Sequence, residues 1–218
     1  MPLLTDPAAI AGLVAREVRT GSRDGAPTRI VIARRTYATD QADLWDALTN
    51  AERIPRWFLP VSGDLKVGGR YQTEGNAGGV VQECAAPRRF AVTWEMGPQV
   101  SWLAINLTAS DDGTQLELVH EAPVVPEFWD QYGPGAVGVG WDLGLMALGL
   151  HLSSGAAVDP AEGLAFPTTP EGTVFVETAA QGWADAAIGD GDDPAAANAA
   201  AQRTVTFYTV EPEDSSQS

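Results

Sequence analysis

The middle of the chain is built from short runs in which apolar and polar residues alternate. Between residues 63 and 121 these runs are GDLKV, GRYQTEG, GGVVQEC, RFAVTWEM, SWLAINLTA and TQLELVHE. A period of two is typical of strands with one buried face, and the steps Gly75-Asn76 and Asp111-Asp112-Gly113 have the composition of hairpin turns. The pattern predicts an antiparallel meander of about six strands.

A different pattern follows the meander, with apolar residues spaced three and four apart from Gly135 to Ser153. The residues on this helical face are Val137, Trp141, Leu145, Leu148 and Leu152. Glycines recur along the segment, and each costs about 1 kcal/mol of helix stability relative to alanine, so packing must hold this helix. A curved antiparallel sheet has to bury one face, and we expect the helix to cover it.

Local signals mark the elements that precede the meander. Asp6-Pro7 has the form of a helix N-terminus, and the β-branched run Arg29–Tyr37 predicts a strand. Asp40 can cap a helix over the residues that follow it, and Asn50 can cap a second, short helix that Pro60 ends.

Two further helices are predicted beyond the closing helix. Thr169-Pro170 and Asp193-Pro194 each place a capping residue before a proline at the first helical position. We therefore expect residues 154–218 to form a helical extension whose tail, EPEDSSQS, is frayed, and residues 1–28 to form a helix and turn that pack on the core.

Several motifs add a family resemblance to this element order. They are Asp43–Phe58 with its Trp-x-Ala-Leu-Thr and Arg-Trp-Phe elements, Gly68–Tyr71, Ala91–Glu95, Leu116–His120 and the Gly140-Trp141 pair. Over residues 29–153 the chain resembles the SRPBCC superfamily, which has the helix-grip fold of START proteins and birch-pollen allergens. Within it, the sequence looks most like the branch named for the activator of the heat-shock chaperone ATPase.

This resemblance implies an α+β helix-grip fold, in which a curved antiparallel sheet wraps around a long C-terminal helix and leaves a cavity between them. Family members bind lipids, hormones or polyketides, or activate a chaperone, and a minority are enzymes. They share no catalytic set, so no catalytic residue is carried over to this chain. The extension after residue 153 lies outside the resemblance.

Aromatic and apolar residues are the candidates for lining such a cavity, because apolar ligand sites are built largely from such side chains. The predicted ligand-binding residues are Trp57, Phe58, Tyr71, Trp94, Leu118, His120, Trp141 and Leu145. Aromatic residues at strand and helix spacing also serve as ordinary core, so both interpretations stay open.

His120 ends an apolar row of the last predicted strand and has two interpretations. It is either a polar anchor for a ligand head group or a core histidine that donates to a backbone carbonyl. Acid–base work would need a partner that the spacing does not supply. Cys84, the single cysteine, is expected to be a small buried residue rather than a nucleophile.

The charge of the chain limits the classes of molecule that it can bind. The 218 residues include 13 Lys and Arg against 29 Asp and Glu, a net charge of −16. Nearly all the bases precede residue 90, whereas Arg203 is the only base after it. This balance argues against nucleic acid, and we expect the later acids to coat the outside of the molecule, which favours neutral or cationic apolar ligands over anionic ones.

Other classes of site lack their signatures. One cysteine excludes a Cys-rich zinc site, Gly75–Gly79 fits a hairpin better than a phosphate loop, and Asp190–Asp193 lacks the later ligands of a calcium loop. We expect no cofactor and no metal. Without a secretion signal or a long enough apolar run, the sequence predicts a soluble, cytoplasmic protein that does not enter membranes.

The sequence thus favours a binding protein over an enzyme, and three hypotheses remain. The first is non-enzymatic binding of a small hydrophobic molecule between sheet and helix. The second is an interaction protein that regulates a chaperone ATPase in the stress response. The third is a cyclase- or hydrolase-type enzyme that uses His120. The terminal additions could also support a homodimer.

Overall fold

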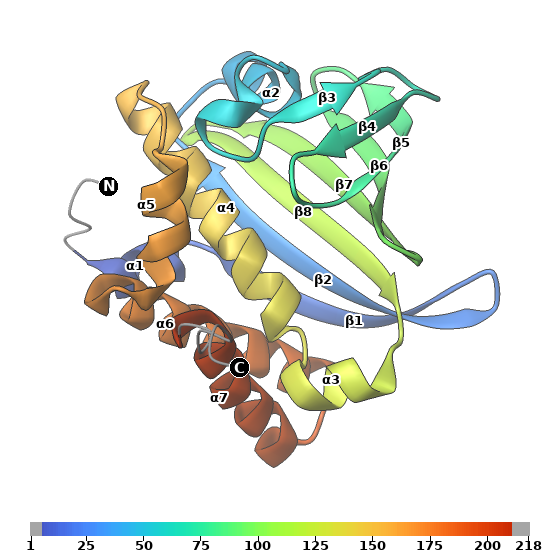
Figure 1. The fold of residues 1–218 in the computed structure, drawn as a ribbon, viewed down its shortest axis with the longest axis vertical. Coiled ribbons are helices and arrows are strands. Elements are labelled where there is room, and N and C mark those ends of the chain that lie inside the picture. The colour runs from blue at the N-terminus through green and yellow to red at the C-terminus, as the bar shows by residue number, and fades with distance from the viewer. Residues whose placement is uncertain (1–5, 211–218) are drawn as a thin grey trace, which may run out of the picture.

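One antiparallel sheet curves around a long helix (Figure 1). The structure is a computed structural model that describes residues 6–210, so the tail expected to be frayed lies outside the described residues. The strand order is β1-β2-β8-β7-β6-β5-β4-β3. The strands are β1 (Ala15–Arg23), β2 (Ala26–Tyr37), β3 (Val61–Gly63), β4 (Arg70–Thr73), β5 (Gly78–Ala85), β6 (Arg89–Met96), β7 (Gln99–Ser110) and β8 (Gly113–Pro123).

Helices flank the sheet at both ends of the chain and between its strands. They are α1 (Pro7–Gly12), α2 (Gln41–Thr49), α3 (Pro126–Tyr132), α4 (Gly135–Ser154), α5 (Pro160–Ala165), α6 (Pro170–Asp190) and α7 (Pro194–Thr209), with 3-10 turns η1 (Ile54–Arg56) and η2 (Phe166–Thr168). The caps predicted at Asp40, Thr169 and Asp193 are confirmed, because these side chains accept hydrogen bonds from the backbone of α2, α6 and α7. The cap predicted at Asn50 is wrong: its side chain accepts from Glu52 in a turn, and η1 begins only at Ile54 without a side-chain cap.

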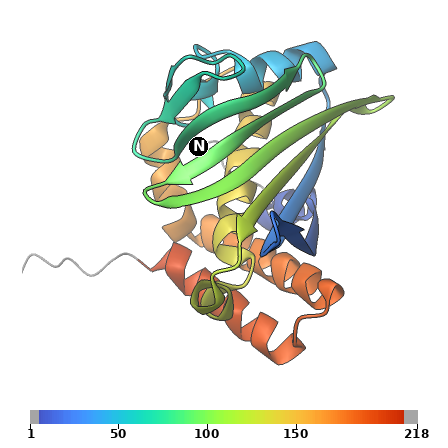
Figure 2. The same cartoon turned by 90° about the vertical axis from the view of Figure 1, so that its right-hand side faces the viewer.

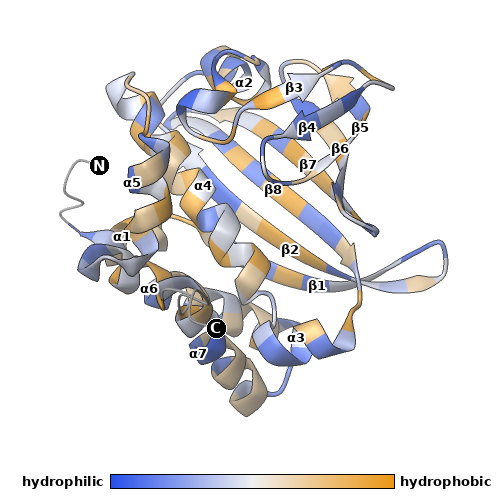
Figure 3. Cartoon of the chain, in the orientation of Figure 1, coloured by the Kyte–Doolittle hydropathy of each residue, from blue (hydrophilic) through white to orange (hydrophobic). Residues whose placement is uncertain are grey.

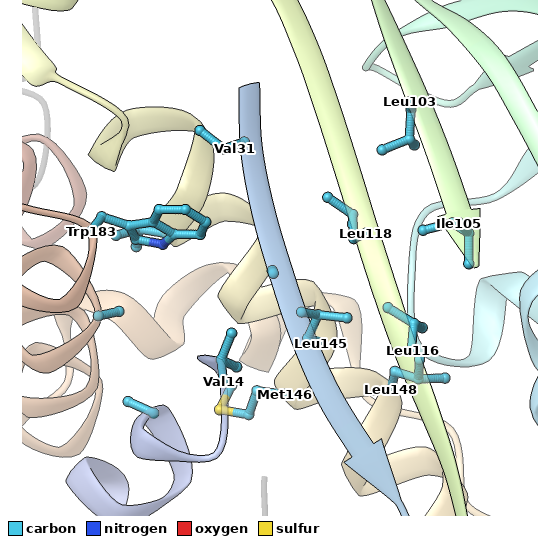
Figure 4. Packing of buried hydrophobic residues seen from close by; sticks show 14 of the residues in the cluster. Val14, Val31, Leu103, Ile105, Leu116, Leu118, Leu145, Met146, Leu148 and Trp183 are labelled. Carbon is cyan, nitrogen blue, oxygen red and sulfur yellow. The ribbon is translucent and has the colours of Figure 1, made fainter. Parts of the chain in front are cut away.

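The predicted cover of the sheet is confirmed, because α4 lies across its concave face (Figures 1 and 2). Alternation along the strands is visible in Figure 3 as successive apolar and polar bands. Leu103 and Ile105 of β7 and Leu116 and Leu118 of β8 are all buried, and Figure 4 shows them on the side of the sheet that Leu145 of α4 faces. This is the α+β helix-grip fold that the resemblance implied.

Strand β1 was not predicted. The expectation of only a helix and a turn before residue 29 missed it because Ala15–Arg23 is mostly polar, and Val18 is its one buried residue. An edge strand paired on one side with β2 needs no continuous apolar face. The expected turn is there, with Asp24 and Gly25 at φ 52° and 81°, and it joins β1 to β2.

The opposing charges of the two halves of the chain meet in the fold. Strand β2 lies beside β8, and Arg34 of β2 binds Glu117 of β8. On the neighbouring helical layer, Arg29 of β2 binds Asp190 and Asp192 at the end of α6. Bases from the first half of the chain and acids from the second half therefore form ion pairs in the folded protein.

The expectation that the later acids coat the outside is wrong for Asp142. This residue of α4 is 0% exposed, because α6 and β1 cover the face of α4 that carries it. Helices α6 and α7 lie together below the sheet in Figure 2, away from α2 at the top.

Helix α4 also passes a test for membrane-spanning helices by length and composition alone, and no other helix within residues 6–210 does. Its place in the grip explains the apolar composition, since Leu145 and Leu148 are buried against the sheet. A core helix that is covered on several sides is apolar for the same reason as a spanning helix.

Candidate functional site

A cavity of about 170 Å³ lies between the inner face of the sheet, helix α4 and the segment from α2 to β3. Seven of the eight predicted ligand-binding residues line it. They are Trp57, Phe58, Tyr71, Trp94, Leu118, Trp141 and Leu145. The structure therefore brings these residues together around one space, whereas His120 lies behind the wall.

Aromatic rings form one side of the cavity. The rings of Phe58 and Trp141 are nearly parallel, with an interplanar angle of 16° and centroids 6.5 Å apart. Trp94 stands against Trp141 with centroids 5.1 Å apart, and Trp57 lies 5.4 Å from Phe58. Strand β6, helix α4 and the turn after η1 thus contribute to a single aromatic corner. Aliphatic residues of β5 to β8 also line the cavity.

The polar atoms of the wall are largely used within the protein. The Tyr71 hydroxyl donates to the Thr93 carbonyl at 2.8 Å, and the Trp57 indole donates to the Ala47 carbonyl at 2.8 Å. Burial raises the pKa of Tyr71 above its usual range, so this hydroxyl stays protonated near neutral pH. The Trp94 indole N–H has no hydrogen-bond partner among the described residues. No Asp, Glu, Lys or Arg from the described part of the chain lines the cavity.

Arg53 holds the segment that carries Trp57 and Phe58 in place. Its Nη1 donates to Asp43 Oδ1 at 2.7 Å and to Asp46 Oδ2 at 3.0 Å, both on α2. Its Nε donates to Nε2 of His151, a buried residue near the end of α4, at 3.3 Å. One guanidinium therefore joins α2, η1 and α4 beside the cavity.

His120 links two parts of the wall from behind. Its Nδ1 accepts a hydrogen bond from the Trp141 indole at 3.0 Å, so Nε2 carries the proton and donates to Ser101 Oγ at 2.8 Å. Ser101 in turn donates to the Trp94 carbonyl at 2.9 Å. Burial lowers the pKa of His120 to about 4, so the ring is neutral at pH 7. Both ring nitrogens are occupied, and neither is free to take a proton from a substrate.

Cys84 was expected to be buried, and this is wrong, because its side chain is exposed while also lining the cavity. A bulge in β5, where the register with β6 shifts between Val81 and Glu83, explains why this side chain faces the cavity. The extra residue turns Cys84 to the same face as Val81. A bulge leaves no signal in an alternating pattern, so the sequence could not place this thiol.

Gly144 is a second wall residue that the sequence analysis did not select. It lies on α4, one turn from Trp141, and a Cβ added there would meet only the Phe58 ring, at 3.9 Å. Its missing side chain leaves space in the cavity. Among residues 6–210, no group of three or more His, Cys, Asp or Glu side chains has the arrangement of a metal site.

Comparisons with known proteins agree with this architecture. The family model described as Activator of Hsp90 ATPase homolog 1-like protein matches residues 38–150. The crystal structure of CalU16 from Micromonospora echinospora has 29% identity and a TM-score of 0.64, and the match covers 79% of this chain and 97% of that one. Its solution NMR structure has 28% identity and a TM-score of 0.68, covering 82% and 97% of the two chains.

A more distant structure shows the same fold alone. DynU16, a protein of the dynemicin biosynthetic locus, has 19% identity and a TM-score of 0.52, over 59% of this chain and 48% of that one. No curated protein matches the chain.

Proposed function

The chain belongs to the family of Activator of Hsp90 ATPase homolog 1-like proteins, and we propose that it binds a small, uncharged, mainly apolar molecule in the cavity between the sheet and α4. The observation that carries the proposal is the chemistry of the wall. Its described lining residues are aromatic, aliphatic or small, without a charged side chain. A charged ligand would lose its hydration there without gaining a partner, which costs several kcal/mol.

The size of the cavity limits the ligand. An apolar cavity of about 150 Å³ in another protein holds benzene, so the 170 Å³ here suits a molecule, or a part of one, of one or two rings. The parallel rings of Phe58 and Trp141 favour a flat aromatic portion. The Trp94 indole N–H has no acceptor among residues 6–210, and we propose that it donates one hydrogen bond to an acceptor on the ligand.

The direct test is binding of a neutral fluorescent probe, N-phenyl-1-naphthylamine, to the purified protein. We expect its emission to rise on binding and the melting temperature to increase with probe concentration. Its anionic analogue, 1-anilinonaphthalene-8-sulfonate, should bind more weakly because the wall offers no cation. Equal or tighter binding of the anionic dye would contradict the proposed ligand class.

A cavity-filling variant locates the binding. Gly144→Leu places a side chain in the cavity from α4, so probe affinity should fall while the protein stays folded. The matched control is Gly189→Leu, on the exposed surface of α6, where a Cβ meets nothing within 4 Å. Loss of binding in both variants, or in neither, would show that the probe does not occupy this cavity. Gly144→Ala is a milder alternative if the leucine overpacks the site.

The family description favours one other function, regulation of a chaperone ATPase. This hypothesis predicts that the protein changes the ATP hydrolysis rate of the Hsp90-type chaperone of its own host. An unchanged rate at saturating protein would count against it. A cytoplasmic location, which such a partner requires, is part of this second proposal.

A further inference from the structure

Helix α4 owes its position to contacts rather than to its own sequence. It contains several glycines, and among the described residues no side chain caps its N-terminus. Its one acidic residue is Asp142, which follows the cavity residue Trp141 and is fully buried on another face of the helix. The contacts of Asp142 therefore show how α4, which forms one wall of the cavity, is held in place.

Two partners from distant parts of the chain meet at a single oxygen of Asp142. Oδ2 accepts from Arg16 Nε of β1 at 3.0 Å and from the Trp183 indole of α6 at 2.9 Å. The other oxygen, Oδ1, is buried and has no hydrogen-bond partner within residues 6–210. Burying a carboxylate with one oxygen unpaired costs folding free energy, so Asp142 does not serve mainly to stabilise the protein. Its two hydrogen bonds instead hold α4 in one orientation relative to β1 and α6.

Both partners are themselves immobilised. Arg16 also donates to the carbonyls of Val14 at 3.1 Å and Ala11 at 2.8 Å. Trp183 is 0% exposed, and Figure 4 shows its ring reaching from α6 into the core. The ring lies so close to Gly138 of α4 that an added Cβ would stand 2.3 Å from it. The carboxylate of Asp142 is therefore bound to two fixed points.

We propose that Trp183 and Asp142 are positioning residues for the cavity, through which the C-terminal extension sets the rotation of α4 that presents Trp141 to the ligand. This inference rests on the proposed function. Adjacent residues of a helix point about 100° apart, so a rotation that moves Asp142 also moves Trp141. That rotation would strain the 3.0 Å bond from Trp141 to His120, which holds the same helix to β8.

The test uses Trp183→Phe, which keeps an aromatic ring but removes the N–H that binds Asp142. The matched control is Trp129→Phe, since the Trp129 indole also donates to a carboxylate, Asp192 Oδ2, at 2.8 Å. Trp129 belongs to α3 and does not line the cavity. Both variants thus lose a hydrogen bond from an indole N–H to a carboxylate, but only Trp183→Phe loses one to α4.

Two readouts separate positioning from mere stability. The first is the Trp141 indole N–H resonance in a 1H–15N spectrum, assigned by its loss in Trp141→Phe. The second is the affinity for N-phenyl-1-naphthylamine. We expect Trp183→Phe to shift this resonance and to weaken probe binding several-fold, whereas Trp129→Phe leaves both as in the wild type.

The proposal is overturned if Trp183→Phe lowers the melting temperature but leaves the Trp141 resonance unchanged. If Trp183→Phe does not fold, Asp142→Asn, which keeps an acceptor for the indole but weakens the bond, is expected to shift the resonance in the same way. An unchanged resonance in that variant would likewise overturn the proposal. If the wild-type protein binds no probe, the proposed function fails, and the resonance still decides whether α6 positions α4.

Discussion

The indole nitrogen of Trp141 donates a hydrogen bond to Nδ1 of His120 across 3.0 Å. This bond joins the helix that closes the cavity to a central strand of the sheet. It requires a neutral imidazole, because a protonated histidine has no acceptor to offer. The stability of the wall is therefore tied to the protonation of a residue that the cavity itself does not expose.

The first prediction is a loss of stability in acid that depends on His120. Burial lowers its pKa from 6.5 to about 4 in the folded protein, so the unfolded chain binds the proton more readily. The neutral His120 ring therefore contributes to the free energy of unfolding above pH 6.5. This contribution is lost as pH falls from 6.5 towards 4, by up to roughly 3 kcal/mol. Denaturant unfolding at pH 7 and pH 4.5 measures it.

The matched comparison for this prediction is His120→Gln, which keeps a donor and an acceptor but does not titrate. Asp142 acts in the opposite sense, because burial raises its pKa to about 6 and its contribution to stability grows as pH falls below that value. The variant removes only the histidine effect, so it should lose less stability in acid than the wild type. An equal loss in both proteins would contradict the prediction.

The second prediction concerns the close approach of α6 to α4. Gly138→Ala improves helix propensity, yet its Cβ would stand 2.3 Å from the buried Trp183 ring, which cannot move freely. We expect a net destabilisation of about 1–3 kcal/mol, measured by denaturant unfolding. Gly189→Ala is the control, since its Cβ meets nothing within 4 Å and should stabilise the protein slightly. A stable Gly138→Ala variant would mean that the two helices are not packed this closely.

The third prediction uses the single cysteine as a reporter of the cavity. Cys84 is exposed and lines the cavity, so it should react with a thiol reagent in the native protein. We expect saturating N-phenyl-1-naphthylamine to slow the reaction, because the bound probe covers part of the same wall. A reaction that needs denaturant would show that the thiol is buried after all. Mass spectrometry of the intact protein follows the modification at one site.

The fourth prediction tests Arg53 as the joint between α2, η1 and α4. Arg53→Met keeps the length of the stem but leaves Asp43 without its ion pair and the buried Nε2 of His151 without a donor. We expect a loss of about 1–3 kcal/mol, of which the exposed ion pairs supply the smaller share. The pKa of Asp43, which the Arg53 hydrogen bond lowers, should rise towards its usual value.

An NMR titration of the Asp43 carboxyl resolves that change in pKa. Arg56→Met is a suitable control, because the Arg56 guanidinium is at the surface and donates to the Gly155 carbonyl rather than to α2. If the two variants lost equal stability, Arg53 would not have the special role that its three contacts indicate.

Local patterns in the sequence were enough to predict strands β4 to β8, the helix that covers them and the caps of the later helices. These features follow from patterns that repeat within a few residues, since periodicity and turn chemistry are local properties of a chain. The same patterns selected Trp94, Leu118 and Trp141 for the cavity wall, because a residue on the inner face of a strand or covering helix points towards the space between them. The run predicted as the first strand of the meander, residues 63–67, is wrong, because β3 ends at Gly63 and a turn follows it.

The partners of the polar groups and the local shifts of register became visible only in the folded structure. Arg16 and Asp142 are 126 positions apart, and neither residue's neighbours reveal that β1 and α6 enclose that face of α4. A one-residue bulge places Cys84 on the cavity side of the sheet. Hydrogen bonds to Trp141 and Ser101 occupy both ring nitrogens of His120, so this residue supports Trp141 and is not an anchor for a ligand. Such contacts depend on which distant segments fold together, and the local pattern of a sequence does not specify that.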